Sequence, residues 1–548
     1  VVLKNYGTVT ISGGAKEKGR SISADDIATA KVIDDNYGEG SLVLDPKSAN
    51  PITIDGVAVP YRELNSTKGV RYAMISNFGL YVDTLIGTNP IDNLGAIGVH
   101  EADLLIGVDA AKEHNDKAFL VKQSILEPYR KAMAKNKSLK WNINSASLTW
   151  AATAKLDDDK LPIEIIMAKK PYTYFASDKK TTRNTYNFAD GLEQRYGVEA
   201  IDSREKALFN KLNDIGGNEE NLLYQAFDEM MGHQYANVQQ RTYGTGRLID
   251  KEITHLSKEW DSKSRQSNKI KTFGMRDEYK TDTAGIIDYK SNAYGFAYVH
   301  ENETVKLGHS SGWYAGAVHN RFKFKDIGGS KENQTMLKLG VFKTMSPAKD
   351  HNGSLQWTIS GEGYVSRNDM HRKYLVVDEI FNAKSDYTTY GVAVKNELGY
   401  NIRTSERTSI RPYGGLKLEY GRFSNIKEKS GEMRLDIKGN DYYSVKPEVG
   451  VEFKYRQPMA VKTTFVTSLG VGYENELGQV GNVKNKAKVS YTEADWFNIR
   501  GEKDDRKGNF KADLNIGVEN QRFGVTLNGG YDTKGKNARG GIGFRLIY

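Results

Sequence analysis

From about residue 269 to the last residue, the sequence repeats one unit: roughly ten residues that alternate between apolar and polar, followed by a turn or a loop. In one such unit the apolar positions are Val445, Pro447, Val449, Val451, Phe453 and Tyr455, and the positions between them are Lys446, Glu448, Gly450, Glu452, Lys454 and Arg456. A strand with this pattern has one apolar face and one charged face. Strands of a soluble sandwich are usually shorter, about five or six residues, and seldom carry so many charges on one face. The repeat therefore favours a membrane-spanning β-barrel with lipid outside and a polar lumen inside.

The number and spacing of the segments agree with a complete barrel. We count about twelve, an even number, as bacterial barrels require. The connections after even-numbered segments are compact (403–408, 457–461 and 519–522), and those after odd-numbered segments are longer and polar (280–290, 326–333, 367–386, 424–442 and 475–508). Short turns belong in the periplasm and long loops outside, so the first strand is expected to begin, and the last strand to end, on the periplasmic side. The predicted fold class is all-β, an antiparallel transmembrane β-barrel of about 12 strands at residues 268–548.

The charged positions of the strands are predicted to face the lumen, because the other face must contact lipid. The residues singled out as lumen-facing are Lys446, Glu448, Glu452, Lys454, Arg456, Lys511 and Glu519. Lysines and arginines stand beside the glutamates in this set. We therefore expect the carboxylates to balance neighbouring positive charges.

Two helical patterns precede the barrel, at residues 219–238 and 245–261. The second places Ile249, Ile253, Leu256 and Trp260 on one stripe, with charged residues around it. A helix surface that is apolar on one stripe and charged elsewhere suits a polar lumen, so we predict that this helix threads the pore. We expect many partly solvated contacts, rather than an apolar core, to hold it there. The alternative is a helix that uses the same stripe to dock outside, on the periplasmic mouth.

Residues 1–200 are less regular than the rest of the chain. Short β-like runs (7–12, 40–45, 51–59, 147–154 and 161–167) alternate with turns, as at the C-terminal end of a β-solenoid, although no clean repeat period is visible. Residues 125–134 look helical, as an insertion or a cap would be. We predict three parts: a passenger end at 1–200, a helical linker that enters and plugs the pore at 201–267, and the barrel at 268–548.

The beginning of the chain and its lack of cysteine predict a piece of a longer exported protein. The first residues have the pattern of a β-strand and not that of a signal peptide. The sequence contains no cysteine. A passenger that crosses a narrow pore unfolded would be blocked by a closed disulfide loop, so the absence of cysteine fits secretion through a barrel.

The linker and the C-terminus carry a resemblance to the monomeric type V autotransporters. The run Ala226-Phe227-Asp228, with Gly232-His233 and Tyr235-Ala236 after it, is similar to the family's linker motif, from which Phe227 and His233 depart. The last residues resemble the β-signal that the outer-membrane assembly machinery reads, through Gly543, Phe544, Leu546 and Tyr548, although Gly541 replaces the usual polar residue. The runs 191–199 and 274–285 resemble the large fusobacterial autotransporter adhesins of the RadD type.

The resemblance implies a translocator in the bacterial outer membrane that exports and anchors a surface-exposed adhesin, used in coaggregation or host-cell attachment. The partners it implies are outer-membrane lipid and lipopolysaccharide, the barrel assembly machinery, periplasmic chaperones, and a ligand on other bacteria or host cells. The barrel itself is expected to be monomeric. The net positive charge is spread over the termini and loops instead of one basic face, so nucleic acid is not indicated.

No motif predicts catalysis, a cofactor or a metal. Residues 308–312 fit G-x-S-x-G, but a nucleophile elbow needs a helix next and a strand pattern follows. Residues 14–21 approach a phosphate loop, but Arg20 stands where lysine should be. The run Asp157, Asp158 and Asp159 reads as a solvated turn rather than a calcium site.

Three alternatives to a tethered adhesin remain open. Cleavage of the passenger inside the pore would need Asn221 or Asn237 beside lumenal Glu448, Glu452 or Glu519. An enzyme-bearing passenger would carry its catalytic residues upstream of this sequence. A plain porin-like channel would have no reason to place a polar helix and a solenoid stub before its first strand.

Overall fold

A computed structural model describes residues 78–87, 101–137, 139–177, 181–258, 266–303, 309–348, 353–459, 462–502, 508–520 and 522–547, together with six short strands nearer the N-terminus. Structural statements below concern these residues. Contacts divide the chain into two units. The N-terminal unit comprises Val1–Thr182, Leu192–Ala226 and Val376–Glu379, and the barrel unit comprises Arg183–Gly191, Phe227–Leu375 and Ile380–Tyr548.

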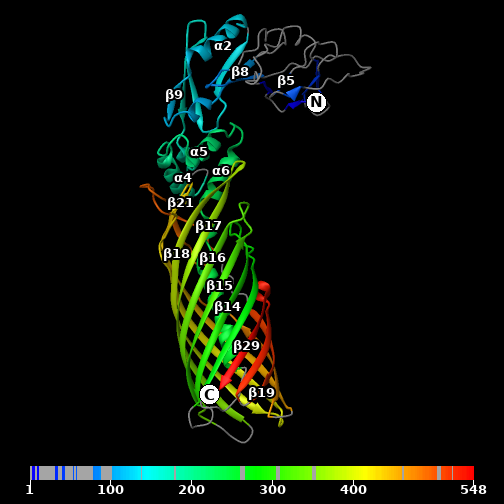
Figure 1. The fold of residues 1–548 in the computed structure, drawn as a ribbon. Coiled ribbons are helices and arrows are strands. Elements are labelled where there is room, and N and C mark those ends of the chain that lie inside the picture. Colours follow the sequence, from blue (N-terminus) through cyan, green and yellow to red (C-terminus); the bar gives the residue numbers. More distant parts are fainter. Residues whose placement is uncertain are drawn as a thin grey trace, which may run out of the picture. The chain divides into compact units, whose positions relative to one another are not determined.

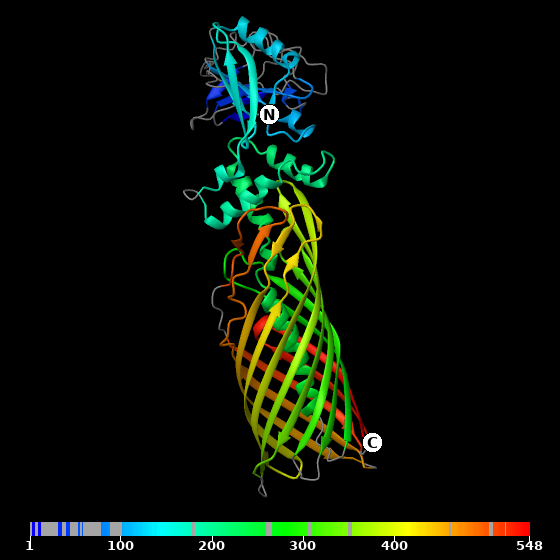
Figure 2. The same ribbon diagram turned by 90° about the vertical axis from the view of Figure 1, so that its left-hand side faces the viewer.

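The barrel unit contains a closed ring of antiparallel strands (Figures 1 and 2). The strands are β13 (Gln266–Tyr279), β14 (Tyr289–Glu303), β15 (Ser310–Phe324), β16 (Lys331–Met345), β17 (Gly353–Val376), β18 (Glu379–Arg403), β19 (Thr408–Phe423), β23 (Asn440–Pro458), β24 (Thr464–Glu474), β27 (Asn509–Glu519), β28 (Phe523–Asp532) and β29 (Asn537–Ile547). Each pairs with its neighbours in the chain, β17 pairs with β18, and the ring closes where β13 pairs with β29, with Lys269 opposite Arg545. The predicted 12-stranded antiparallel barrel is confirmed.

Alternate residues of each strand lie on opposite sides of the barrel wall. On β23, Val449 and Phe453 are 59% and 44% exposed, whereas Lys446 and Glu448 are each 7% exposed. Similar apolar side chains lie exposed along the other strands, among them Leu339, Val392, Leu418, Leu514 and Leu527. A continuous apolar surface of this kind suits contact with hydrocarbon and not with water.

The short connections lie where the sequence predicts them. Strand β18 ends at Arg403 and β19 begins at Thr408; β27 ends at Glu519 and β28 begins at Phe523. The predicted long loop at 367–386 is wrong. Strands β17 and β18, which are 24 and 25 residues long, continue through this segment and turn at Val377 and Asp378, where Val377 takes φ 59°. The two strands stay paired beyond the rest of the wall because polar side chains there, such as Arg372, have buried partners.

Two of the predicted long loops contain a small sheet of their own. Residues between β19 and β23 form β20 (Ile426–Lys427), β21 (Ser430–Gly431) and β22 (Leu435–Ile437), and residues between β24 and β27 form β25 (Lys486–Val489) and β26 (Phe497–Asn498). The order β20-β22-β25-β26 joins the two loops, while β21 pairs with β18. The alternation that predicts barrel strands is absent from such short strands, so this sheet was not anticipated.

The helical linker differs from the prediction in its boundaries. Helix α6 spans Glu220–Met230, a 3-10 turn η3 follows at His233–Tyr235, and one helix, α7, spans Val238–Lys258. The predicted break before residue 245 does not occur. Gly244 and Gly246 weaken an isolated helix. Gly246, however, lies against the barrel wall, where an added Cβ would be 3.6 Å from Nζ of Lys338. No described helix is long and apolar enough to cross a membrane.

The described strands of the N-terminal unit form four sheets, which are accompanied by short helices. Strands β7 (Phe78–Val82), β8 (Glu101–Ile106) and β10 (Lys140–Ser145) run parallel, and β2 (Val9–Ile11) joins them. Strands β9 (Ala118–Leu120), β12 (Pro162–Lys169) and β11 (Trp150–Leu156) are antiparallel. The remaining elements are β1 (Leu3–Asn5), β3 (Lys31–Asp34), β4 (Gly40–Val43), β5 (Thr53–Ile54), β6 (Val57–Ala58), η2 (Asp109–Lys112), α2 (Gln123–Lys135), α3 (Tyr172–Phe175) and α5 (Arg204–Asn213), and α4 (Arg183–Arg195) has residues in both units.

Some sequence predictions for this unit are confirmed and some were missed. The predicted helix at 125–134 is part of α2, and the runs 147–154 and 161–167 overlap β11 and β12. Helices α3, α4 and α5 were not anticipated. The runs 7–12, 40–45 and 51–59 contain strands β2, β4, β5 and β6, and their other residues lie outside the described residues.

Candidate functional site in the lumen of the barrel

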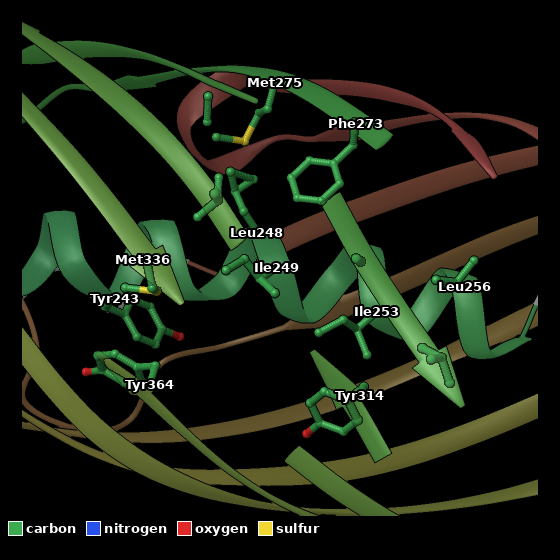
Figure 3. Close-up of a cluster of buried hydrophobic side chains, with 14 of the residues drawn as sticks. Tyr243, Leu248, Ile249, Ile253, Leu256, Phe273, Met275, Tyr314, Met336 and Tyr364 are labelled. Atoms are coloured by element: carbon green, nitrogen blue, oxygen red, sulfur yellow. The ribbon is translucent and has the colours of Figure 1, made fainter. Parts of the chain in front are cut away.

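Helix α7 lies inside the ring of strands, as Figures 2 and 3 show. Its apolar stripe packs against β13 to β16. Leu248, Ile249, Ile253 and Leu256 form one buried cluster with wall residues that include Phe273, Met275, Ala293, Ala297, Val299, Tyr314, Val318 and Met336. The helix and the wall approach closely at Gly316, where a Cβ would lie 2.7 Å from Cγ2 of Ile249. Trp260, the fourth residue of the predicted stripe, lies outside the described residues.

The other sides of α7 carry charges that pair with the wall. Lys251 pairs with Asp532, Glu252 pairs with Lys271 at 2.8 Å, and His255 lies 3.2 Å from Asp513. The side chains of Glu252 and Lys271 have no exposed surface. Removing one partner of such a pair leaves an uncompensated buried charge, which costs about 3–5 kcal/mol.

One carboxylate of α7 joins a group of acidic and basic residues from three strands. Asp250 accepts hydrogen bonds from Lys338 and Lys417, and one oxygen each of Asp250, Glu362 and Glu419 lie within 4.8 Å of one another. Three close carboxylates resemble a cation site, but Lys417 lies 2.8 Å from both Glu362 and Glu419. The two ammonium groups supply the positive charge that a metal ion would, so the group is a salt-bridge network.

At its first turn, α7 is held by a fully buried arginine. Arg241 donates to Glu332 at 2.7 Å and to the carbonyl oxygen of Gln234 at 3.0 Å, and Tyr387 donates to Glu332 at 2.9 Å. The side chains of Arg241 and Glu332 have no exposed surface. A bidentate guanidinium–carboxylate pair of this kind fixes both the position and the rotation of the helix end.

The two ends of α7 lie at opposite ends of the pore. Glu332, the partner of Arg241, is the second residue of β16 and follows a loop on the long-loop side. Lys258, the last residue of α7, pairs with Glu452 near the end of β23, which leads into a short turn. Since long loops of such barrels face outside and short turns face the periplasm, the chain before α7 leaves the pore at the outer end.

The residues predicted to face the lumen all lie on the inner side, in two kinds of contact. Near the turn end, Glu452 accepts from Lys258 at 2.8 Å and Lys454 donates to the carbonyl oxygen of Lys258 at 3.1 Å. Along the wall, the remaining residues pair with neighbours: Lys511 with Glu448, Lys446 with Glu474 at 3.5 Å, and Arg456 with Glu519 at 2.5 Å. The carboxylates thus balance adjacent bases.

Several of the wall residues that hold α7 were missed by sequence reasoning. They are Lys271, Glu332, Lys338, Glu362, Lys417, Glu474, Asp513 and Asp532. Each is a charged residue within a strand of alternating pattern, and this pattern indicated that its side chain faces the lumen. The sequence could not reveal which of the many inward charges would meet the helix.

The prediction that α7 is held by partly solvated contacts rather than by an apolar core is wrong on one side of the helix. The inner face of β14 presents Ala293, Ala297 and Val299, and its outer face presents Tyr294 and Phe296. Because both faces of β14 are apolar there, the sequence pattern does not show which face points into the lumen and which contacts lipid. The helix is therefore held by apolar packing on one side and by buried ion pairs on the others.

Asn237 and two of the carboxylates considered for passenger cleavage contact other residues. Asn237 donates to the carbonyl oxygen of Ile287 at 3.2 Å and accepts from Arg241. Glu448 pairs with Lys511, and Glu519 pairs with Arg456. These contacts do not place Asn237 beside either carboxylate. Ser310 of the G-x-S-x-G match is the first residue of strand β15, so the helix that a nucleophile elbow needs does not follow it.

The space left beside α7 is unequal along the pore. A cavity of about 520 Å³ lies beside its C-terminal half, lined by charged side chains and by hydroxyls such as Ser310, Thr344 and Ser360. A cavity of about 50 Å³ lies beside its first turns, lined among others by Gln240, Tyr243 and Arg247. The pore is thus roomy toward the short turns and nearly filled toward the long loops.

A closed antiparallel barrel with an apolar outer face and a charged helix in its lumen defines the class of outer-membrane β-barrels. Within that class, the family model described as "Autotransporter beta-domain" matches residues 269–531. These residues belong to that family: the barrel is an autotransporter translocator domain, which lies in the outer membrane and exports a passenger.

Three solved structures are similar to part of the chain. They are the translocator domain of autotransporter NalP from Neisseria meningitidis (12% identity, TM-score 0.44, covering 57% of this chain and 100% of that one), the beta domain of the Bordetella autotransporter BrkA (14%, 0.36, 52% and 100%) and the transport unit of autotransporter AIDA-I from Escherichia coli (11%, 0.34, 55% and 98%). No curated protein matches the sequence significantly.

Proposed function

We propose that this translocator anchors a surface-exposed adhesin, and that the passenger stays attached to it. The observation that carries the proposal is the way α7 is held. Buried pairs such as Arg241 with Glu332 and Glu252 with Lys271 keep the helix in the lumen, and the chain before it leaves at the outer end. An adhesin must remain attached to the cell to work, and a continuous, firmly held helix provides that attachment.

The passenger is proposed to be the end of a β-solenoid, of the type found in the large fusobacterial RadD-like adhesins. Support comes from the parallel, in-register strands of the N-terminal unit. Val82 of β7 stands opposite Ile106 of β8, and both side chains are fully buried. Parallel strands stacked with aligned apolar side chains are the building principle of solenoids. The proposed ligand is a surface component of other bacteria or of host cells.

The proposed partners follow from the barrel. Outer-membrane lipid and lipopolysaccharide would contact its apolar outer face. The barrel assembly machinery would read the C-terminal signal Gly543, Phe544, Leu546 and Tyr548; Tyr548 lies outside the described residues. Periplasmic chaperones would carry the unfolded chain before assembly. We propose no enzymatic activity and no cofactor for this chain.

Deleting and restoring the gene in its own bacterium tests the adhesin proposal. We expect deletion to abolish coaggregation or attachment to host cells, and the intact gene to restore it. Unchanged adhesion after deletion, with a new deficit in a secreted enzymatic activity, would favour the enzyme-bearing passenger instead.

A conductance measurement tests the porin alternative. Deletion of residues 245–258 from the full chain should raise the conductance in planar bilayers from a nearly closed level to that of a stable aqueous channel about 10 Å wide, the diameter of a helix with side chains. A porin would conduct equally well with the helix in place.

A further inference from the structure

The two long loops that share a sheet form a compact structure at the outer end of the pore, which we call the cap (residues 424–439 and 475–502). Its strands β22 and β25 pair directly, with Leu435 opposite Val489. The cap has its own apolar core, made of Ile426, Leu435, Ile437, Ala487, Val489, Phe497 and Ile499, all 1% exposed or less. Barrel loops that only connect strands have no need of such a core.

The cap core is completed by the segment that leaves the pore, Phe227 to Gln239, which we call the exit segment. Phe227, Met230 and Tyr235 are buried. At Gly232, a Cβ would lie 2.6 Å from Cδ1 of Leu435, so the backbone of the exit segment touches the cap directly. Phe188 bridges the two, with ring centroids 6.0 Å from Phe227 and 5.7 Å from Phe497.

A buried ion pair joins the cap, the β17–β18 extension and the exit segment. Arg372 donates to both oxygens of Glu428, at 2.7 and 2.8 Å, and to the carbonyl oxygen of Met230 at 3.2 Å. Tyr235 donates to Glu428 at 2.9 Å. The side chains of Arg372 and Glu428 have no exposed surface. Without the exit segment, two of these polar contacts would be lost and the pair would be open to water.

The second cap loop also binds the exit segment through specific hydrogen bonds. Asn485 donates to the carbonyl oxygen of Tyr235 at 2.8 Å and accepts from Gln239 at 2.7 Å. Arg500 lies 2.6 Å from Asp228. Both loops of the cap therefore recognise the same stretch of chain.

With the cap in place, a second chain cannot pass the outer end of the pore. The cavity beside the first turns of α7 measures about 50 Å³, and one liquid water occupies about 30 Å³. An extended segment needs about 5 Å between its backbone and a neighbouring one. Val480 of the cap loop and Tyr243 of α7 belong to the same buried cluster, which fills this end.

We propose that the cap is a latch that closes on the exit segment only when the rest of the passenger has left the pore. While a passenger segment is still crossing, the outer end must be open, so the cap core stays incomplete. Once the pore is clear, the exit segment docks, completes that core and buries the Arg372–Glu428 pair. Closure then seals the outer end and adds a second hold on the anchored chain. The inference rests on the export of a passenger and not on what the passenger binds.

Hydrogen exchange of the full chain in lipid discs tests whether the cap depends on the exit segment. The variant Tyr235→Phe removes a hydrogen bond to a buried carboxylate and keeps the ring. We expect the amides of β22 and β25, which carry no substitution, to exchange about tenfold faster than in the wild type. Tyr298→Phe, which removes a hydrogen bond to Asn268 on the barrel wall, is the matched control and should leave both strands unchanged. Unchanged exchange in Tyr235→Phe would mean that the cap folds by itself, and would overturn the proposal.

Crosslinking in a chain whose export is halted tests whether the cap closes before or after the passenger has left the pore. This experiment tests the proposal by itself if the Tyr235→Phe variant fails to assemble. The chain has no cysteine, so Gln239→Cys with Asn485→Cys gives one pair for a short bismaleimide. A domain closed by a disulfide and fused before Val1 halts export until reductant is added. We expect the crosslink only after release. Arg403→Cys with Ser409→Cys, opposite in register, should crosslink in both states. Equal crosslinking of the first pair in halted and released chains would overturn the latch, whereas loss of adhesion would not bear on it.

Discussion

The interiors of the two units are built in opposite ways. The barrel places most of its apolar side chains outside. Apart from the apolar wall that contacts α7, its lumen holds charges, including Arg241, Glu332, Glu252 and Lys271, which have no exposed side-chain surface. The N-terminal unit has an ordinary apolar core, with Leu104, Leu126 and Trp150 fully buried. The solvent outside each unit explains the difference. Lipid accepts only the apolar face of a strand, so the polar face must turn inward and find partners there.

The comparison teaches where stability comes from in each unit. In the N-terminal unit, burying apolar area is favourable by itself. In the lumen, burying charge is unfavourable unless every charge has a partner. The lumen should therefore be sensitive to the loss of one partner and more tolerant of the loss of both. The following four predictions test that contrast, in order of decreasing effect.

The largest effect is expected for Glu252→Ala in α7. It leaves Lys271 and Arg539, both buried, without this carboxylate, and should lower the free energy of releasing the helix from the lumen by about 3–5 kcal/mol. A fluorophore on Thr254→Cys in a denaturant titration measures release. The double variant Glu252→Ala with Lys271→Met should cost clearly less. An equal or larger cost for the double variant would show that the pair itself, and not an unpaired charge, sets the stability.

A smaller effect is expected at the apolar wall of the lumen. Gly316→Ala introduces a Cβ 2.7 Å from Cγ2 of Ile249, and overpacking of this kind costs about 1–3 kcal/mol. Combining it with Ile249→Ala, which removes the clashing methyl group but itself empties a buried site, should cost less than the sum of the two single variants. The same titration gives the coupling between the two sites. Strictly additive costs would mean that the helix does not touch this wall.

The N-terminal unit also buries some charged residues, among them Lys169, whose side chain has no exposed surface and lies 2.5 Å from Glu193. Burial lowers the pKa of Lys169 from 10.5 to about 8, although Glu193 opposes the shift. Between these pH values the unfolded chain holds a proton that the folded unit lacks, so stability rises with pH. From pH 8 to 9.5 the gain is about 1.5 kcal/mol.

Limited proteolysis of the N-terminal unit in the full chain measures this gain. Lys169→Met should remove the rise between pH 8 and 9.5, and Lys117→Met, which changes a half-exposed amine beside the same Glu193, should keep it. Measurement stops below pH 10, because burial raises the pKa of Tyr172 and Tyr196 and their titration acts in the opposite direction above it. A flat profile in the wild type would contradict the prediction.

The smallest effect is expected at the turn end of the lumen. Lys258 pairs with Glu397 and Glu452, but its side chain is 28% exposed beside the large cavity. Water can replace its partners there, so Lys258→Ala should lower the free energy of helix release by about 1 kcal/mol or less. Raising the salt concentration should shrink this effect further and leave that of Glu252→Ala nearly unchanged. A cost equal to that of Glu252→Ala would remove the distinction between buried and solvated pairs.

The barrel was predictable because its signal is local and repeated. Alternation along β23 is enforced by two different solvents, and the compact turn at 403–408 follows directly from it. The charged pattern around Ile249 and Leu256 also indicated a helix in a polar lumen. What was missed depends on distant contacts. The β17–β18 extension needs Glu428 to pair with Arg372, and α7 extends past Gly244 because the surrounding wall supports it.

The N-terminal unit was harder to predict for a physical reason. Helix α5 begins with Ser203 accepting a hydrogen bond from the backbone of Lys206, a cap that can be recognised in sequence but not told apart from a turn without its packing. The parallel sheet joins strands far apart in the chain, such as β8 and β10. No local pattern specifies such a pairing, so the solenoid remains a proposal.

The pairing of the first barrel strand, β13, with the last, β29, closes the barrel into a ring through which the chain passes. The ring closes around α7, which is covalently joined to β13 at one end and to the folded N-terminal unit at the other. The lumen holds one helix, which is about 10 Å across with its side chains, whereas a folded domain of 100 residues has a radius of gyration of about 13 Å. A folded domain of that size therefore cannot be drawn through the ring. Even if every ion pair in the lumen were broken, the passenger would stay covalently joined to the barrel through β13, and only a cut in the chain would release it.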